Sequence, residues 1–195
     1  MQPIIIRRLY ELGMIKFGDF KLSSGKKSSF YINLRELPSY PDLFHDIMNI
    51  VLEKIREISF DVICGIATGG IPFASYLAFS LKKPLVYVRK SPKNHGLKDM
   101  IVGRVNKRRV LLIDDVATTG GSLIRAINIL RASGANIDST YVIVLRSDRA
   151  IDLLKTQSVN LLYLYHARDI FSVLKNIGLI DNSQYKVLLQ EIDGI

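Results

Sequence analysis

Two adjacent aspartates, Asp114 and Asp115, are the residues whose types and spacing point most directly to chemistry. They follow an apolar run, and small, hydroxyl-bearing and glycine residues come after them, from Val116 to Ser122. Two carboxylates so close repel each other, and a ribose diol, a cation or a nearby Lys or Arg would relieve that repulsion. Glycines admit a ligand close to the backbone, and amides at a helix start bind phosphate. The stretch therefore predicts a site for a phosphorylated ligand, with the acidic pair serving hydroxyls or a metal.

A strand and a helix must hold this stretch in place. Val110–Ile113 is apolar without alternation, which favours a strand buried on both faces. Because two carboxylates would be costly inside the core, we expect the aspartates at the carboxyl end of that strand. Apolar residues recur at helical spacing from Leu123 to Leu130, and Ser133-Gly134 ends the pattern. The helix would begin at the loop, where its dipole favours an anion.

Other predicted strands also end in polar residues, and ligands in parallel sheets bind beyond such ends. The strand at 61–66 precedes a second glycine turn at 67–70, which suits a diphosphate but is common in βα turns. The strand at 85–88 precedes a cluster of basic side chains, namely Arg89, Lys90, Lys93 and His95. A long polar loop in a compact domain is typical of a lid, and these cations would neutralise a departing diphosphate. A merely solvated lysine-rich loop is the alternative.

Two arginines follow the strand predicted at 139–145. A strand-end arginine binds a carboxylate through two parallel hydrogen bonds, and either Arg146 or Arg149 has a suitable position. From spacing alone, a surface ion pair with Asp148 or Asp152 is an equally good interpretation.

Strands and helices alternate along most of the chain, which predicts an α/β fold with a parallel sheet flanked by helices. Strands are expected at 61–66, 85–88, 110–113, 139–145 and 160–165, and helices at 4–12, 42–57, 71–81, 123–133 and 150–155. We expect one domain, 1–195, with an α/β core over about 42–167 and a mostly helical tail over 170–195. Residues 1–35 would form a small hood over the carboxyl edge of the sheet, with short strands at 17–22 and 30–33.

Composition narrows the class of protein. The chain has 195 residues, 48% of them hydrophobic, which is enough for one domain with a good core. The formal net charge of +9 attracts anions, but charge alone does not choose between nucleic acid, phosphates and acidic lipids. No Cys/His finger, basic zipper, secretory signal or membrane-length apolar run is visible, and the single Cys64 excludes a disulfide framework within one chain. We expect a cytoplasmic protein that binds neither nucleic acid nor membrane.

The stretch from Val110 to Ser122 resembles the phosphoribosyl diphosphate (PRPP) motif of the type I phosphoribosyltransferases. It lacks the Gly-Lys-Ser/Thr of a Walker A loop and the G-x-G-x-x-G of a dinucleotide fingerprint. Three further segments resemble the orotate branch of that family: Leu22–Tyr31 (L-x-S-G-x-x-S-x-[YF]-[YF]), Gly65–Pro72 and Arg89–Gly96 (R-K-x-x-K-x-H-G). The resemblance covers most of the chain.

The resemblance implies transfer of a phosphoribosyl group from PRPP to orotate, with Mg²⁺ bridging mainly PRPP oxygens rather than held directly by the protein. Asp114 and Asp115 would hold the ribose hydroxyls, and Thr118 and Arg146 would contact orotate. The catalytic set would be Lys93, His95, Asp114 and Asp115. The PRPP site would comprise Arg89, Lys90, Lys93, His95, Asp114, Asp115, Val116, Ala117, Thr118, Thr119, Gly120, Gly121 and Ser122. The basic loop would reach into a neighbouring subunit, which implies a homodimer.

Two positions depart from the pattern of many relatives, which carry lysines where this chain has Ser23 and Gly69. Lys26, Lys27 or a loop lysine would have to compensate, and the sequence leaves this open. Two other functions also stay open: a purine or uracil phosphoribosyltransferase, and a PRPP-sensing regulator on the same fold. The lysine and histidine loop argues against the regulator, because a sensor has no leaving group to neutralise.

Overall fold

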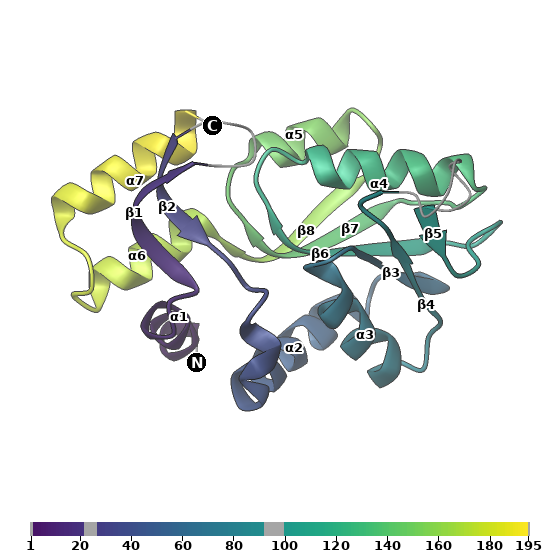
Figure 1. Ribbon diagram of the computed structural model, residues 1–195, viewed down its shortest axis with the longest axis horizontal. Coiled ribbons are helices and arrows are strands. Elements are labelled where there is room, and N and C mark those ends of the chain that lie inside the picture. Colours follow the sequence, from purple (N-terminus) through teal and green to yellow (C-terminus); the bar gives the residue numbers. More distant parts are fainter. Residues whose placement is uncertain (1, 22–26, 92–99, 195) are drawn as a thin grey trace.

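A six-stranded sheet forms the centre of the molecule in a computed structural model that describes residues 2–21, 27–91 and 100–194 (Figure 1). In spatial order its strands are β5 (Ile101–Val102), β4 (Leu85–Val88), β3 (Val62–Ile66), β6 (Val110–Ala117), β7 (Ser139–Leu145) and β8 (Asn160–His166). All neighbouring pairs are parallel except β4 and β5, which are antiparallel. The predicted parallel α/β sheet is confirmed.

Helices cover both faces of this sheet (Figure 1). One face packs against α2 (Pro41–Ile55) and α3 (Gly70–Ser80), and the other against α4 (Gly121–Ala132) and α5 (Arg149–Lys155). Alternate side chains of β6 enter two separate cores, because successive residues of a strand point to opposite faces. Leu111 and Ile113 belong to the core on the α2–α3 side, whereas Val110 and Leu112 belong to the core on the α4–α5 side. The unbroken apolar run thus follows from burial on both faces.

The N-terminal and C-terminal elements pack together at one end of the sheet (Figure 1). They are α1 (Gln2–Glu11), the antiparallel hairpin β1 (Ile15–Lys21) and β2 (Lys27–Ile32), the 3₁₀ turn η1 (Leu37–Ser39), α6 (Ala167–Asn176) and α7 (Asn182–Gly194). Phe30 of β2 meets Phe171 of α6 edge to face, with ring centroids 4.8 Å apart. The predicted short N-terminal strands are confirmed, and the C-terminal helices complete the same layer.

Three features of the secondary structure differ most from the sequence prediction. The motif strand β6 continues to Ala117 because its pairing with β7 continues through Asp114, Val116 and Ala117. The aspartates lie in the carboxyl-terminal half of β6, as expected, but the strand continues past them instead of ending at Ile113. The polar stretch after β4 contains the short edge strand β5, and the helical tail is split by a break at 177–181. Among the described residues, no helix has both the length and the apolar composition needed to span a membrane.

Candidate active site

A cavity of about 670 Å³ lies at the carboxyl ends of β3, β4, β6 and β7. The structure brings eleven of the predicted site residues to it: Arg89, Lys90, Asp114, Asp115, Val116, Thr118, Thr119, Gly120, Gly121, Ser122 and Arg146. Ala117 is buried in the core of the α4–α5 side instead. Lys93 and His95 lie outside the described residues. The cavity collects polar groups from strand ends, as expected for a ligand site in a parallel sheet.

The two aspartates serve opposite sides of β6, because they are successive residues of one strand. Ser122 at the start of α4 donates its hydroxyl to Asp114 Oδ2 at 3.4 Å. The Asp115 carboxylate lies against Gly69 in the turn before α3. Backbone amides also hold the pair: Asp115 N–H donates to Asp114 Oδ1 at 3.0 Å, and Val116 N–H donates to Asp115 Oδ1 at 2.9 Å. The strand thus links both glycine turns to one acidic pair.

Burial makes this acidic pair electrostatically unusual. Only 6% of Asp114 and 9% of Asp115 is exposed. Desolvation, and then the neighbouring charge of Asp115, raise the pKa of Asp114 well above its ordinary value. A ligand that donates hydrogen bonds to the carboxylates, or that brings a cation, would offset the cost of the buried charge. A ribose diol satisfies the first condition.

The loop after β6 presents backbone amides to the cavity. Gly120 takes the left-handed conformation, with φ of 83°, and forms the N-cap of α4. It has no side chain to cap the helix, so the first amides of α4 keep hydrogen-bonding capacity for a ligand. Together with the helix dipole, this arrangement is suited to a phosphate.

The turn before α3 explains the glycine at position 69. A Cβ atom added there would overlap the Asp115 carboxylate, and one added at Gly70 would overlap the carbonyl oxygen of Ile113. A lysine at position 69 would therefore require Asp115 to move. Thr68 and Gly69 line the same cavity as the aspartates. The second glycine turn, a weak signal in the sequence, is thus part of the same site.

The start of the basic loop is held by two contacts with other elements. Arg89 N–H donates to the Met100 carbonyl at 2.8 Å, which joins the two ends of the segment. The Arg125 guanidinium of α4 donates to the Lys90 carbonyl and also lines the cavity. Sequence reasoning missed Arg125, which looks like an ordinary exposed helix residue in the amphipathic pattern.

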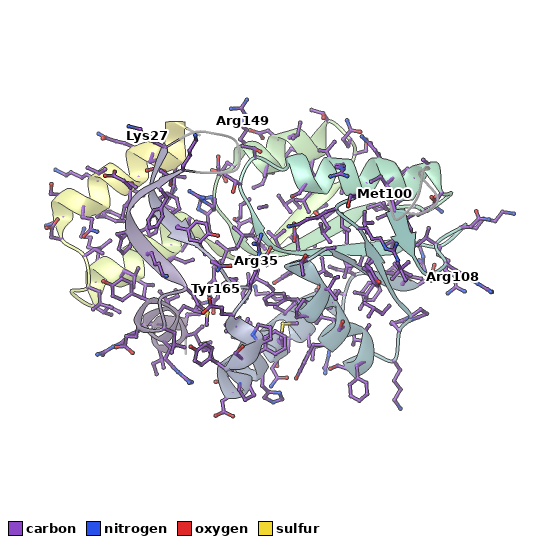
Figure 2. The ribbon with its side chains drawn as sticks, in the orientation of Figure 1. Lys27, Arg35, Met100, Arg108, Arg149 and Tyr165 are labelled. Atoms are coloured by element: carbon purple, nitrogen blue, oxygen red, sulfur yellow. The ribbon has the colours of Figure 1, made fainter. Side chains whose placement is uncertain are left out.

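Arg146, rather than Arg149, belongs to the cavity. Its side chain is 3% exposed, and its guanidinium carbon lies 4.1 Å from the centre of the Phe30 ring. Desolvation lowers its pKa from the ordinary value. Its acidic partner is Glu191, at 3.9 Å, in place of the surface pair with Asp148 or Asp152 that spacing allowed. Arg149 projects outward from the start of α5 (Figure 2).

Comparison with known proteins identifies the family. The phosphoribosyl transferase domain model matches residues 34–160. A curated orotate phosphoribosyltransferase from Staphylothermus marinus is 42% identical over 184 residues, which are 94% of this chain and 91% of the relative. The chain belongs to the orotate phosphoribosyltransferase family. Members from Sulfurisphaera tokodaii and Pyrobaculum islandicum are 42% and 40% identical over more than nine tenths of each chain.

Solved structures of this family share the fold. The crystal structure of orotate phosphoribosyltransferase from Aeropyrum pernix has a TM-score of 0.78 at 33% identity, covering 91% of this chain and 99% of the other. The UMP synthase of Leishmania donovani has a TM-score of 0.89 at 26% identity and matches the whole of this chain. This chain spans 42% of the length of that protein.

The domain model stops short of two segments that contact Arg146. Ser28 and Phe30 precede the matched range, and Glu191 follows it. The first two fall in Leu22–Tyr31, a segment that resembles the orotate branch of the family, although their contacts with Arg146 were not foreseen. Glu191 had no signal at all, because a single acidic residue in an amphipathic terminal helix is usually a solvated one.

Proposed function

We propose that this protein transfers the 5-phosphoribosyl group of PRPP to orotate, giving orotidine 5′-phosphate and diphosphate in the biosynthesis of UMP. One observation carries the proposal beyond family membership. A single cavity is lined by an acidic pair, a phosphate-type loop and a buried arginine. A buried guanidinium is costly unless a ligand or partner needs its charge, and orotate carries a carboxylate.

The donor would bind along β6 and the loop that follows it. Asp114 and Asp115 would accept hydrogen bonds from the ribose hydroxyls, for which their buried carboxylates are suited. Residues 116–122 would hold the 5′-phosphate through amides and hydroxyls at the start of α4. This side of the cavity would bind the phosphoribosyl group, which is the part of PRPP that is retained in the product.

The acceptor would bind against Thr118 and Arg146, with the guanidinium facing the orotate carboxylate. A purine or uracil has no carboxylate to pair with this guanidinium, and the carboxylate of Glu191 stays 3.9 Å from it. The same argument disfavours a purine or uracil phosphoribosyltransferase, which the curated relatives do not favour either.

The reaction breaks the bond between the anomeric carbon and the diphosphate oxygen, and a ring nitrogen of orotate forms the new bond. The protein would act by positioning the reactants and by stabilising charge. Arg89 and Lys90 stand at the cavity and would bind the departing diphosphate. Lys93 and His95 are assigned the same task from the sequence.

Magnesium fits the chemistry of this site. Mg²⁺ keeps several waters and binds largely through substrate phosphates, so PRPP oxygens would bridge the ion while Asp114 and Asp115 hold the ribose hydroxyls beside it. In the described part of the chain, no three His, Cys, Asp or Glu residues form a possible metal cluster, and PRPP would supply most of the coordination. When bound, the ion would offset the charge of the leaving diphosphate.

A homodimer whose basic loops are shared between subunits belongs to the same proposal, as does a cytoplasmic location. Co-refolding two variants, Lys93→Ala and Asp115→Asn, tests whether sites are shared, because each variant is expected to be inactive alone. If each site draws on both chains, each heterodimer contains one intact site. The mixture would then regain about a quarter of the wild-type activity. Sites contained within one chain would give no recovery. Light scattering on a sizing column measures the oligomer independently.

The decisive experiment follows the loss of orotate absorbance after addition of PRPP and Mg²⁺. We expect turnover that requires both additions and that yields diphosphate in equal amount. Hypoxanthine, adenine and uracil serve as parallel acceptors under the same conditions. Turnover of one of these without turnover of orotate would overturn the proposal.

A further inference from the structure

A hydrogen-bonded chain connects the C-terminal helix α7 to the buried arginine of the cavity. Figure 1 shows α7, in yellow, beside the purple strand β2, and Lys27 at the start of β2 lies next to the helix in Figure 2. Glu191 of α7 accepts three hydrogen bonds from the beginning of β2. They come from the Ser28 hydroxyl to Oε1 at 2.5 Å, and from the Ser29 N–H and hydroxyl to Oε2 at 2.7 Å and 2.5 Å.

Ser28 passes this connection on to Arg146. The guanidinium of Arg146 donates to the Ser28 oxygen at 3.0 Å. The single Ser28 hydrogen has two acceptors within reach, the Phe30 carbonyl at 2.7 Å and Glu191 Oε1 at 2.5 Å. The carboxylate is the stronger acceptor because it is charged. The arginine therefore points at a hydroxyl whose own hydrogen points at a carboxylate.

We propose that Glu191 is a positioning residue of the acceptor site, which acts through Ser28 to hold the Arg146 guanidinium in the orientation that receives the orotate carboxylate. This inference rests on the proposed function and adds α7 to the machinery of the acceptor site. Orotate itself would touch Arg146 and not Glu191.

The other surroundings of the Arg146 guanidinium show why it needs such a support. One face of its guanidinium lies over the Phe30 ring, and one of its NH₂ groups is committed to Ser28 and Glu191. Its Nε–H is buried and has no hydrogen-bond partner among the residues that the structure describes. Few interactions thus fix a side chain that is 3% exposed. An arginine that is already fixed loses less entropy when it binds a carboxylate.

The geometry also shows whether Glu191 supports Arg146 or competes with orotate for it. A competing carboxylate would occupy the position of the orotate carboxylate and would have to be free to leave when the substrate arrives. Both oxygens of Glu191 are engaged by Ser28 and Ser29, and the gap of 3.9 Å to Arg146 is longer than a hydrogen bond. Glu191 is therefore an anchor for Arg146 rather than a stand-in for the substrate.

Steady-state kinetics of Glu191→Gln test the inference, because glutamine keeps the shape and removes the charge. We expect the KM for orotate to rise about tenfold, with kcat and the KM for PRPP within about twofold of wild type. Ser28→Ala should give the same split, and the double variant should be no worse than the poorer single one, since both act in one chain. Gln190→Ala, the exposed neighbour on α7, is the matched control and should leave every constant unchanged.

The outcomes separate this inference from the proposed function. A wild-type protein that does not use orotate overturns both. A wild-type protein that uses orotate, with an unchanged orotate KM in Glu191→Gln and Ser28→Ala, overturns the inference alone. A lower orotate KM in Glu191→Gln would mean competition and would also overturn it. Parallel losses in kcat and both KM values, with a lower melting temperature, would show a structural role only.

Discussion

One unbroken stretch, Asp114–Ser122, makes most of the donor side of the cavity, whereas the acceptor side joins segments far apart in the chain. Ser28 and Arg146 are 118 positions apart, and Ser28 and Glu191 are 163 apart. The donor side depends on a strand, a tight turn and a helix start, which are local structures. The acceptor side exists only when both ends of the chain have packed against the sheet.

This difference has a functional consequence. Substitutions in the β6–α4 segment should act on PRPP, and substitutions in the hairpin or α7 should act on orotate. The two glycine turns are linked through the Asp114–Asp115 pair, so the turn before α3 belongs with the donor side. Kinetic constants for PRPP and for orotate, measured separately in each variant, test this division.

The largest effect is expected for Asp115→Asn. The variant keeps the shape of the side chain but loses the charge that would stabilise the ribose hydroxyls in the transition state. We expect kcat/KM for PRPP to fall by about a hundredfold or more. Asp152→Asn, at a position whose side chain is 75% exposed, is the control. A loss below fivefold would remove Asp115 from the donor site.

Arg146→Lys should affect the other side of the cavity. A lysine cannot reproduce the planar pair of donors, so the KM for orotate should rise about thirtyfold or more, which corresponds to about 2 kcal/mol. The KM for PRPP should stay within about twofold. Arg149→Lys, three residues along and outside the cavity, should change neither constant. Equal losses for both substrates in Arg146→Lys would contradict the division.

Gly69→Ala examines the link between the two turns. Its Cβ would displace the Asp115 carboxylate, so the KM for PRPP should rise about tenfold while the KM for orotate changes little. Gly194→Ala is a suitable control, because no heavy atom lies within 4 Å of its added Cβ. If Gly69→Ala has wild-type constants, the function of the Asp115 carboxylate does not depend on its close approach to residue 69.

The smallest effect is expected on the pH dependence of the free energy of unfolding. It compares Asp114 with Asp61, which lie at opposite ends of the sheet. Burial raises the pKa of Asp114, so the folded protein binds more protons than the unfolded chain. The free energy of unfolding should therefore fall as pH rises from about 4 towards the folded pKa of Asp114. Asp114→Asn should remove that decline, which urea unfolding at several pH values would measure.

Asp61 should show the opposite sign. Hydrogen bonds from Arg109 lower its pKa from 3.8 to about 2, so its contribution is present above about pH 4 and is lost as pH falls to about 2. Because the pair is exposed on the surface, the change in Asp61→Asn should be small, and activity should be unaffected. If the contributions of both aspartates to the free energy of unfolding rise with pH, burial does not govern the pKa of Asp114.

Much of the donor side could be predicted from the sequence, because its signals are local. The unbroken apolar run, the glycines and the helical spacing after them each report a backbone preference within a few residues. The end of β6 was mispredicted for a non-local reason: pairing with β7 keeps Asp114 and Asp115 inside the strand. That position sends the two carboxylates towards different turns, which the sequence did not reveal.

The amino-acid sequence alone was enough to predict a parallel sheet, the alternation of strands and helices along most of the chain, and the position of the glycine-containing loop after β6. Spacing placed either Arg146 or Arg149 after β7, and the family resemblance pointed to Arg146. The burial of Arg146 against Phe30 and its connection through Ser28 to Glu191 became visible only in the folded chain. The physical reason is range: backbone preferences act between near neighbours, whereas side-chain contacts between the two ends of a chain arise from packing alone.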